Sequence, residues 1–233
     1  QKAKEMLEKA FSLNKKDARI FLELDQIYKK LGMNIKERLY KFEENNVVVE
    51  SRDDLYIEYI TLLNLSGMYE ESYKLIKNRK FHPWEGGEGK VPTQYTTTLI
   101  GLAKEKMRLE KWEEAKNYLV KALVYPENLG EGKLEGTKDN HIYYYLGCVS
   151  EKLGLKGEAK GYFEKATIGT DEPAGMMYYN DQPADMILFQ GLAKLKLGKD
   201  AEAKARFYRL INYGEQHIFD EPKIEYFAVS LPD

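Results

Sequence analysis

The sequence predicts an all-α protein built from stacked pairs of antiparallel helices. Small and large apolar residues recur at helical spacing, and the same pattern returns along the 233 residues. A glycine also follows several of the predicted helices. Self-similarity of this kind is typical of repeat architectures, in which each unit buries its apolar face only against its neighbours. Together these signals predict an α-solenoid.

Residues 140–168 carry the pattern most clearly. An aromatic-x2-Leu-Gly run is followed by Ala-x3-Phe-x2-Ala, at Tyr143, Leu146, Gly147, Ala159, Phe163 and Ala166. The small residues let two antiparallel helices approach closely, and the large residues fill the seam between them. This order of residues resembles the tetratricopeptide repeat (TPR), a helix–turn–helix unit of about 34 residues. The resemblance implies a right-handed α-α superhelix.

The same template fits the rest of the chain. In the next unit the matching positions are Ile187, Gly191, Ala203 and Phe207, with Leu210 in place of the last small residue. Upstream they are Leu99, Leu102, Ala103, Ala115, Leu119, Ala122 and Pro126, then Tyr56, Tyr59, Leu63, Ser72 and Ile76, then Phe21, Leu24 and Tyr28. Ala3, Leu7 and Ala10 have the spacing of a second helix. We therefore expect about five repeats plus a half repeat, in a single TPR-like domain over 1–233.

Signals for helix ends support this division. Each of four predicted first helices is followed by a glycine, and a residue at positive φ ends a helix at little cost. These glycines are Gly32, Gly67, Gly154 and Gly198. Ser51-x-x-Asp54 resembles a capping box, which predicts a helix start there. Residues 43–52 fit neither helix well, so a distorted helix end and a short extended piece both remain open.

The spacing of the later units departs from the family. The equivalent small residues Ser72, Ala115, Ala159 and Ala203 are 43, 44 and 44 residues apart. About ten extra residues therefore enter each of three junctions, at 80–93, 125–140 and 169–183. In a solenoid, insertions at one repeated junction fall on one edge, which is often the binding edge.

The first two insertions share sequence. Residues 81–91 read FHPWEGGEGKV, and residues 124–134 read VYPENLGEGKL. The third insertion keeps the glycine, proline and aromatic character but lacks the Gly-Glu-Gly-Lys run. Long loops are usually functional or disordered, and the shared sequence and bulky aromatics argue against disorder.

These two loops add a narrower resemblance. A TPR array that carries them is similar to the C-terminal region of large bacterial proteins of unknown function. The resemblance also covers the closing residues 226–233, which read YFAVSLPD. It implies an upstream β-rich domain similar to mutarotase-like, sugar-binding folds. Because the chain starts at Gln1, already in helical pattern, we expect it to be a fragment of a longer protein.

Composition narrows the classes of function. The 36 Lys+Arg against 38 Asp+Glu give a formal net charge of −2, which offers no reason to expect nucleic acid or an anionic membrane as a partner. One cysteine cannot form an internal disulfide or a multi-cysteine metal site. Apolar runs are short and no signal peptide is visible, so we expect a cytoplasmic protein without a membrane span.

The Gly-Glu-Gly-Lys run is not a nucleotide-binding loop. A Walker motif needs a glycine separated by four residues from Gly-Lys, and a Ser or Thr after the lysine. Trp84 and Glu127 occupy the glycine positions, while Val91 and Leu134 follow the lysines. No strand is predicted before either loop.

Catalytic and metal sites are not expected either. The three histidines, His82, His141 and His217, are far apart in sequence, and no His or Asp is placed to activate Cys148. Carboxylates in the first two insertions are compatible with sugar cleavage by an acid and a base. Glutamates in glycine-rich loops more often cap helices or pair with lysines, so we expect no enzyme, no cofactor and no metal.

The resemblance also indicates which face binds a partner. TPR first helices line an inner groove, and their fifth positions here are Leu22, Ile57, Ile100, Tyr144 and Leu188. Only Lys104 and Lys29 could hold a carboxylate nearby, so an apolar or extended segment is the better-matched ligand. The alternative, that this stripe packs between adjacent units, is equally well supported.

The sequence therefore predicts a non-enzymatic TPR scaffold that binds a protein or peptide segment, for which the upstream domain is one candidate. The groove residues are Ile57, Ile100, Lys104, Tyr144 and Leu188. The loop-edge residues are Phe81, His82, Trp84, Glu85, Glu88, Tyr125, Glu127, Glu131, Tyr178 and Tyr179. The alternative is an accessory helical-repeat region of a carbohydrate-active enzyme, whose loops help form a sugar site.

Overall fold

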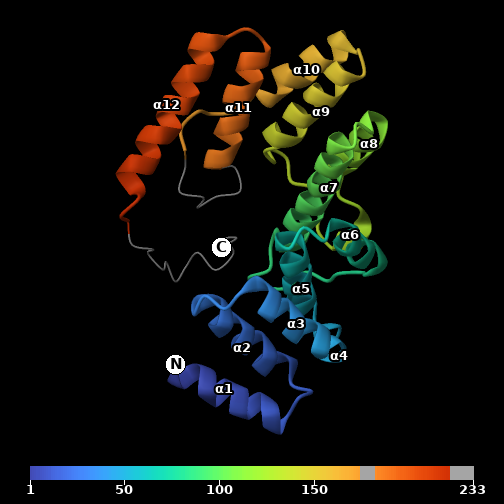
Figure 1. Cartoon of the computed structure of the whole chain (residues 1–233), viewed down its shortest axis with the longest axis vertical. Helices are drawn as coiled ribbons and strands as arrows, with labels where there is room; N and C mark the ends of the chain where they lie inside the picture. The colour runs from blue at the N-terminus through green and yellow to red at the C-terminus, as the bar shows by residue number, and fades with distance from the viewer. Residues whose placement is uncertain (174–181, 221–233) are drawn as a thin grey trace. The chain divides into compact units, whose positions relative to one another are not determined.

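A computed structural model describes residues 1–173 and 182–220, and its regular elements in those ranges are all helical (Figure 1). The chain divides into two compact units: unit 1 is Gln1–Gly101 with Glu127–Gly130, and unit 2 is the described part of Leu102–Pro126 with Glu131–Asp233. The all-α prediction is confirmed. The repeat number and the single domain over 1–233 stay predictions.

The helices are α1 (Lys2–Leu13), α2 (Ala18–Lys30), α3 (Ile35–Glu44), α4 (Asn46–Val49), α5 (Asp53–Leu65), α6 (Tyr69–Asn78), α7 (Lys90–Arg108), α8 (Trp112–Ala122), the 3-10 helix η1 (Glu127–Leu129), α9 (Asn140–Lys152), α10 (Lys156–Ala166), α11 (Ala184–Lys196) and α12 (Asp200–His217).

Four helix turns have the predicted glycine geometry. Gly32, Gly67, Gly154 and Gly198 have φ values of 71°, 76°, 78° and 72°. At the α9–α10 turn, the Leu155 N–H donates to the Ser150 carbonyl at 2.9 Å, which closes a Schellman motif. The α7–α8 turn has the same bond, from Lys111 to Lys106, but Glu110 occupies the left-handed position with φ 57°. A side chain there costs about 1–2 kcal/mol.

The predicted capping box at the start of α5 is wrong. α5 begins at Asp53 with Arg52 as its N-cap, so Ser51 lies before the cap position. The Ser51 hydroxyl donates instead to the Val48 carbonyl at 2.6 Å, and Asp54 pairs with Arg52. The capping box is absent because the helix starts two residues after Ser51 rather than one.

Residues 43–52 are mostly helical. α3 continues to Glu44, and the short helix α4 follows after Asn45, with Val48 and Val49 buried. Of the two alternatives, the distorted helix end is therefore the one observed.

Aromatic rings run through the core of unit 1. The ring of Phe21 lies 5.0 Å from Phe11 and 5.1 Å from Phe42, and Phe42 lies 6.2 Å from Tyr59. These contacts join α1, α2, α3 and α5. Aromatic pairs at such distances add about 0.5–1.5 kcal/mol each beyond the apolar area that they bury.

A buried ion cluster also joins α2, α3 and α5. Arg38 donates to both carboxylate oxygens of Asp25, at 2.8 and 2.7 Å, and to Glu58 at 2.7 Å. Arg38 and Asp25 are both buried. Removal of one partner would strand the other charge, at a cost of about 3–5 kcal/mol.

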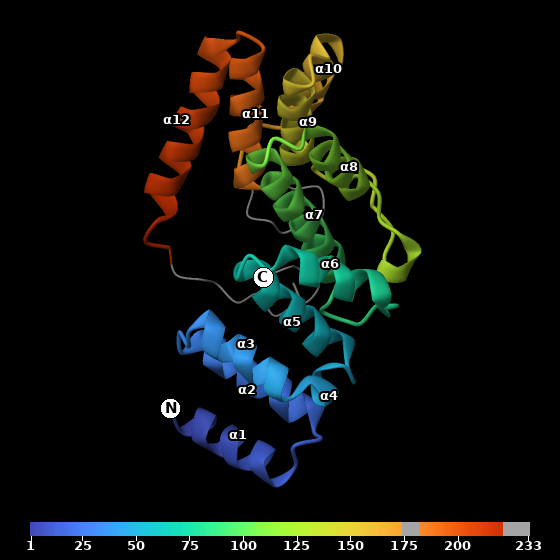
Figure 2. The same ribbon diagram turned by 45° about the vertical axis from the view of Figure 1, so that its right-hand side comes forward.

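Unit 2 shows why its motif residues are small. α9 packs against α10, and α11 packs against α12, as antiparallel neighbours (Figure 2). A Cβ on Gly147 would lie 2.4 Å from the ring of Phe163, and a Cβ on Gly191 would lie 2.4 Å from the ring of Phe207. Each glycine therefore leaves the space that the aromatic ring of its partner helix fills, as the sequence pattern predicts.

Candidate functional site

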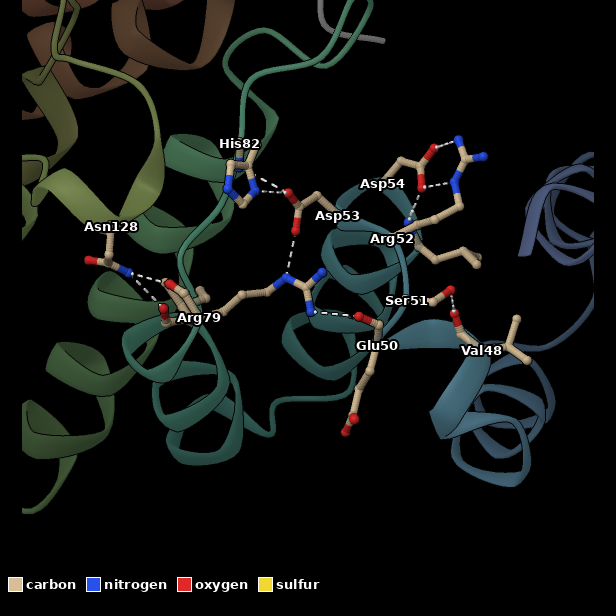
Figure 3. Close-up of polar contacts among 11 residues, drawn as sticks. Val48, Glu50, Ser51, Arg52, Asp53, Asp54, Arg79, His82 and Asn128 are labelled. Carbon is tan, nitrogen blue, oxygen red and sulfur yellow. Dashed lines mark hydrogen bonds and ion pairs between the residues drawn. The ribbon is translucent and has the colours of Figure 1, made fainter. Parts of the chain in front are cut away.

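Asp53 ties the loop between α6 and α7 to the first turn of α5 (Figure 3). Its carboxylate accepts from Arg79 Nε at 2.6 Å and from the His82 N–H at 2.9 Å, and it lies 3.2 Å from His82 Nδ1. Burial alone would raise the pKa of Asp53, but the hydrogen bonds from His82 and Arg79 hold the pKa below its ordinary value. Asp53 is therefore an anion that fastens this loop.

Asn128 brings the second insertion to the same place (Figure 3). Its side-chain amide donates to the carbonyls of Ile76 and Arg79, both at 2.9 Å. The backbone carbonyl of Asn128 accepts from the Phe81 N–H at 2.8 Å. The end of α6 thus has its carbonyls satisfied by a residue about 50 positions away in sequence. We refer to Asp53, Arg79, Phe81, His82 and Asn128 as the loop latch.

Phe81 packs inside the loop latch. It is 2% exposed, and its ring lies 6.1 Å from the ring of Tyr56. The Arg79 guanidinium lies 4.1 Å from the centre of the Tyr56 ring and 5.7 Å from that of Phe81. Phe81 was expected at a binding edge, but in this structure its ring has no free face for a partner.

Trp84 folds back onto its own loop. A Cβ on Gly87 would lie 2.0 Å from the indole, so only glycine fits beneath it. Glu88 is half-buried, and its Oε2 is buried without a hydrogen-bond partner among the described residues. Both residues thus belong more to the packing of the loop than to an open edge.

The other loop-edge residues are in mixed environments. His82, Glu85 and Glu127 are exposed, while Tyr125 and Glu131 are half-buried. Lys133 Nζ lies 5.2 Å from the ring centre of Tyr125. Tyr178 and Tyr179 lie outside the described residues. A binding role for the loop edge stays a prediction.

A second group of aromatic side chains lies on α9 and α11. The ring of Phe189 is 5.9 Å from His141, 5.7 Å from Tyr144 and 5.6 Å from Tyr145. These four rings are half-buried, and Leu188 beside Phe189 is 40% exposed. We refer to these five residues as the aromatic patch. Its rings contact one another across α9 and α11.

The aromatic patch is uncharged and has a cation at its border. Lys104, near the end of α7, places its Nζ 4.9 Å from the centre of the Tyr145 ring, and no carboxylate among the described residues pairs with it. Burial lowers the pKa of His141 to about 4, helped by the charges of Lys104 and Lys133. His141 is therefore neutral at physiological pH.

Cys148, Glu151 and Lys196 adjoin the patch. Lys196 Nζ lies 2.5 Å from Glu151, and this hydrogen bond raises the pKa of Lys196. Burial raises the pKa of the Cys148 thiol, and burial together with Cys148 raises the pKa of Tyr144. The Cys148 thiol is therefore protonated at neutral pH. Because Lys196 and Glu151 carry opposite charges, these three residues add no net charge beside the aromatic patch.

The structure separates the predicted groove residues into two groups. Ile57 and Ile100 are buried core residues, in agreement with the packing alternative for this stripe. Tyr144 instead belongs to the aromatic patch, Lys104 lies at its border, and Leu188 precedes Phe189 on α11 with its side chain exposed. Sequence reasoning missed Tyr145 and Phe189, although each directly follows a fifth position, in the pairs Tyr144-Tyr145 and Leu188-Phe189.

The described residues contain neither a candidate metal site nor a candidate membrane span. Within 1–173 and 182–220, no group of three or more His, Cys, Asp or Glu side chains could hold a metal ion. In the same ranges, no helix has the length and apolar character needed to cross a membrane.

Comparison with known proteins supports the fold. No family model matches the chain. The structure resembles that of BtubC (BKLC) from P. vanneervenii, with a TM-score of 0.55 and 18% identity over 96% of this chain and 92% of that chain. Lower scores relate it to YrrB, described as a TPR protein with an unusual peptide-binding site (TM-score 0.42, 16% identity, 91% of this chain and 94% of that chain), and to an ArsTM double mutant of MamA RS-1 (0.45, 12%, 87% and 97%). At 18% identity the similarity to BtubC concerns the fold alone.

Proposed function

We propose that this protein is a helical-repeat scaffold that binds an extended protein segment on the aromatic patch. The observation behind the proposal is the half-exposed cluster of four rings on α9 and α11, together with the exposed Leu188 that precedes Phe189 on α11. Exposed apolar clusters commonly mark sites of contact. Tyrosine suits such a site because its ring offers apolar area while its hydroxyl forms hydrogen bonds.

The chemistry of the patch indicates the kind of segment. Leu188 and Phe189 offer an apolar surface for an aliphatic or aromatic anchor residue. Lys104 offers a cation without a carboxylate partner in the described chain. A segment that carries an acidic residue close to its apolar anchor therefore matches the patch best.

The titratable groups at the patch favour binding over catalysis. A nucleophilic cysteine needs a lowered pKa, whereas burial raises that of Cys148. His141 has a pKa of about 4, too low for a general base working near neutral pH. Its Nδ1 is also buried without a hydrogen-bond partner among the described residues.

The alternative function, an accessory region of a carbohydrate-active enzyme, stays a prediction, as does binding to an upstream domain of the same polypeptide. The residue best suited to stack on a sugar, Trp84, lies over Gly87 instead. The described structure offers no observation that favours sugar binding over peptide binding.

Peptide selection tests the proposal. Random peptides displayed on phage are selected on the wild-type protein, and the affinities of the selected peptides are measured by titration. Leu188→Asp should weaken them at least about tenfold, because it places a charge against the apolar anchor.

Val120→Asp serves as a matched control. Val120 is 45% exposed on α8, close to the 40% of Leu188, and it is not part of the patch. This variant should bind the selected peptides with unchanged affinity. Equal binding by wild type and Leu188→Asp, or a selection that yields no peptide, would contradict the proposal.

A further inference from the structure

The last helix of the described chain, α12, has a second apolar face. Ala203 is buried on one face of α12, and Phe207 on the same face packs over Gly191 of α11. Another face, about 100° around the helix, is exposed among the residues that the structure describes. Its members recur at alternating spacings of three and four residues, which is the seam spacing of a coiled coil. They are Ala201, Lys204, Tyr208, Ile211 and Glu215 of α12, and Ile218, which is the C-cap of α12 and has helical backbone angles.

All six residues of this α12 seam are exposed. Tyr208 is 65% exposed, Ile211 53% and Ile218 71%, large values for side chains of this size. Next to the seam, Leu210, Gly214 and Phe219 help to line an open apolar hollow. The seam therefore exposes apolar area that association would remove from water.

We propose that a second copy of this chain covers the α12 seam, in an antiparallel pairing of two α12 helices. The order of residues is self-complementary about a two-fold axis between Tyr208 and Ile211. Tyr208 then meets Ile211 of the other copy, and the small Ala201 meets the large Ile218. Antiparallel coiled coils form such layers, and two-fold symmetry makes each contact occur twice.

Charge complementarity identifies the second copy as the occupant. In this register Lys204 lies opposite Glu215 of the other copy, and this pair occurs twice, once on each side of the two-fold axis. Neither side chain has an ion-pair or hydrogen-bond partner within the described residues. A parallel pairing would place Lys204 beside Lys204 and Glu215 beside Glu215, which like-charge repulsion disfavours.

Sedimentation velocity over a range of protein concentrations, at low ionic strength, tests the pairing. Wild type should form a reversible dimer, with a Kd in the micromolar range because one helix pair is a small interface. Lys204→Glu and Glu215→Lys should each weaken the dimer about tenfold, since each replaces two ion pairs by two repulsions. The double variant Lys204→Glu/Glu215→Lys should restore the wild-type Kd.

Two further variants complete the test. Gln216→Lys, on α12 but outside the seam, should leave the Kd unchanged. Ile211→Asp should abolish the dimer while the far-ultraviolet circular dichroism spectrum shows an intact helical fold. A chain that stays monomeric up to about 1 mM would overturn the proposal. So would a double variant that dimerises no better than the single ones.

Discussion

The loop latch and the aromatic patch are both rich in aromatic and charged residues, but the structure uses them differently. In the loop latch, Phe81 is buried and Asp53, Arg79 and Asn128 direct their polar atoms at other parts of the chain. In the aromatic patch, the rings around Phe189 stay half-exposed and Lys104 has no carboxylate partner in the described chain. The polar groups of the loop latch are thus paired within the chain, whereas the aromatic patch has half-exposed rings and a lysine without a carboxylate partner among the described residues.

This difference predicts that substitutions in the two regions have opposite effects on stability and on peptide binding. Substitutions in the loop latch should lower stability and leave peptide binding by the folded protein unchanged. Substitutions at the surface of the aromatic patch should remove binding and change stability little.

Phe81→Ala should have the largest effect. The substitution deletes a buried ring that contacts Tyr56 and leaves a cavity, so the free energy of unfolding should fall by about 3–5 kcal/mol. Urea denaturation followed by circular dichroism measures the change. A loss below about 1 kcal/mol would show that the loop is not part of the folded core.

Asn128→Ala should lower the free energy of unfolding by about 1–3 kcal/mol. The carbonyls of Ile76 and Arg79 would lose their shared amide donor at the end of α6. The control is Asn117→Ala, an exposed position on α8, for which we expect a change within about 0.5 kcal/mol. Equal effects of the two variants would contradict the role of Asn128.

The contribution of Asp53 should depend on pH. Since folding lowers the pKa of this carboxyl, its stabilising effect is full above the ordinary pKa of about 3.9 and is lost as pH falls through the lower, folded value. The stability difference between wild type and Asp53→Asn should therefore be constant near neutral pH and shrink below about pH 4. Urea denaturation at several pH values measures it. A difference that grows on acidification would contradict the latch.

Leu188→Asp should have the smallest effect on stability. Its side chain is already 40% exposed, so the free energy of unfolding should change by less than about 0.5 kcal/mol. The same variant should lose affinity for selected peptides. A large loss of stability would indicate that Leu188 contributes to the core. It would then contradict the proposed difference between the loop latch and the aromatic patch.

Much of the fold was predictable from the sequence because its signals are local. The turn glycines follow from positive φ, which few other residues adopt at low cost. Gly147 and Gly191 follow from the approach of paired helices, since a Cβ would meet the rings of Phe163 and Phe207. The capping box failed because Ser51 and Asp54 match a pattern that ignores where the helix begins.

The candidate site was only half predictable. Tyr144, Leu188 and Lys104 could be found from their positions in the repeat, but Phe189 becomes important only when α9 and α11 lie side by side. The role of Phe81 depends on Asn128, which comes from a different insertion. No spacing within either loop reveals such a contact, because it is made between segments far apart in sequence.

Hydrogen–deuterium exchange with a selected peptide tests the central claim most directly. On addition of the peptide, backbone amides of α9 and α11 should exchange more slowly, while residues 79–89 and 127–130 should be unaffected. The Leu188→Asp protein should show no such protection at the same peptide concentration. Protection confined to 79–89 and 127–130, with α9 and α11 unchanged, would contradict the account and identify the loops as the binding surface.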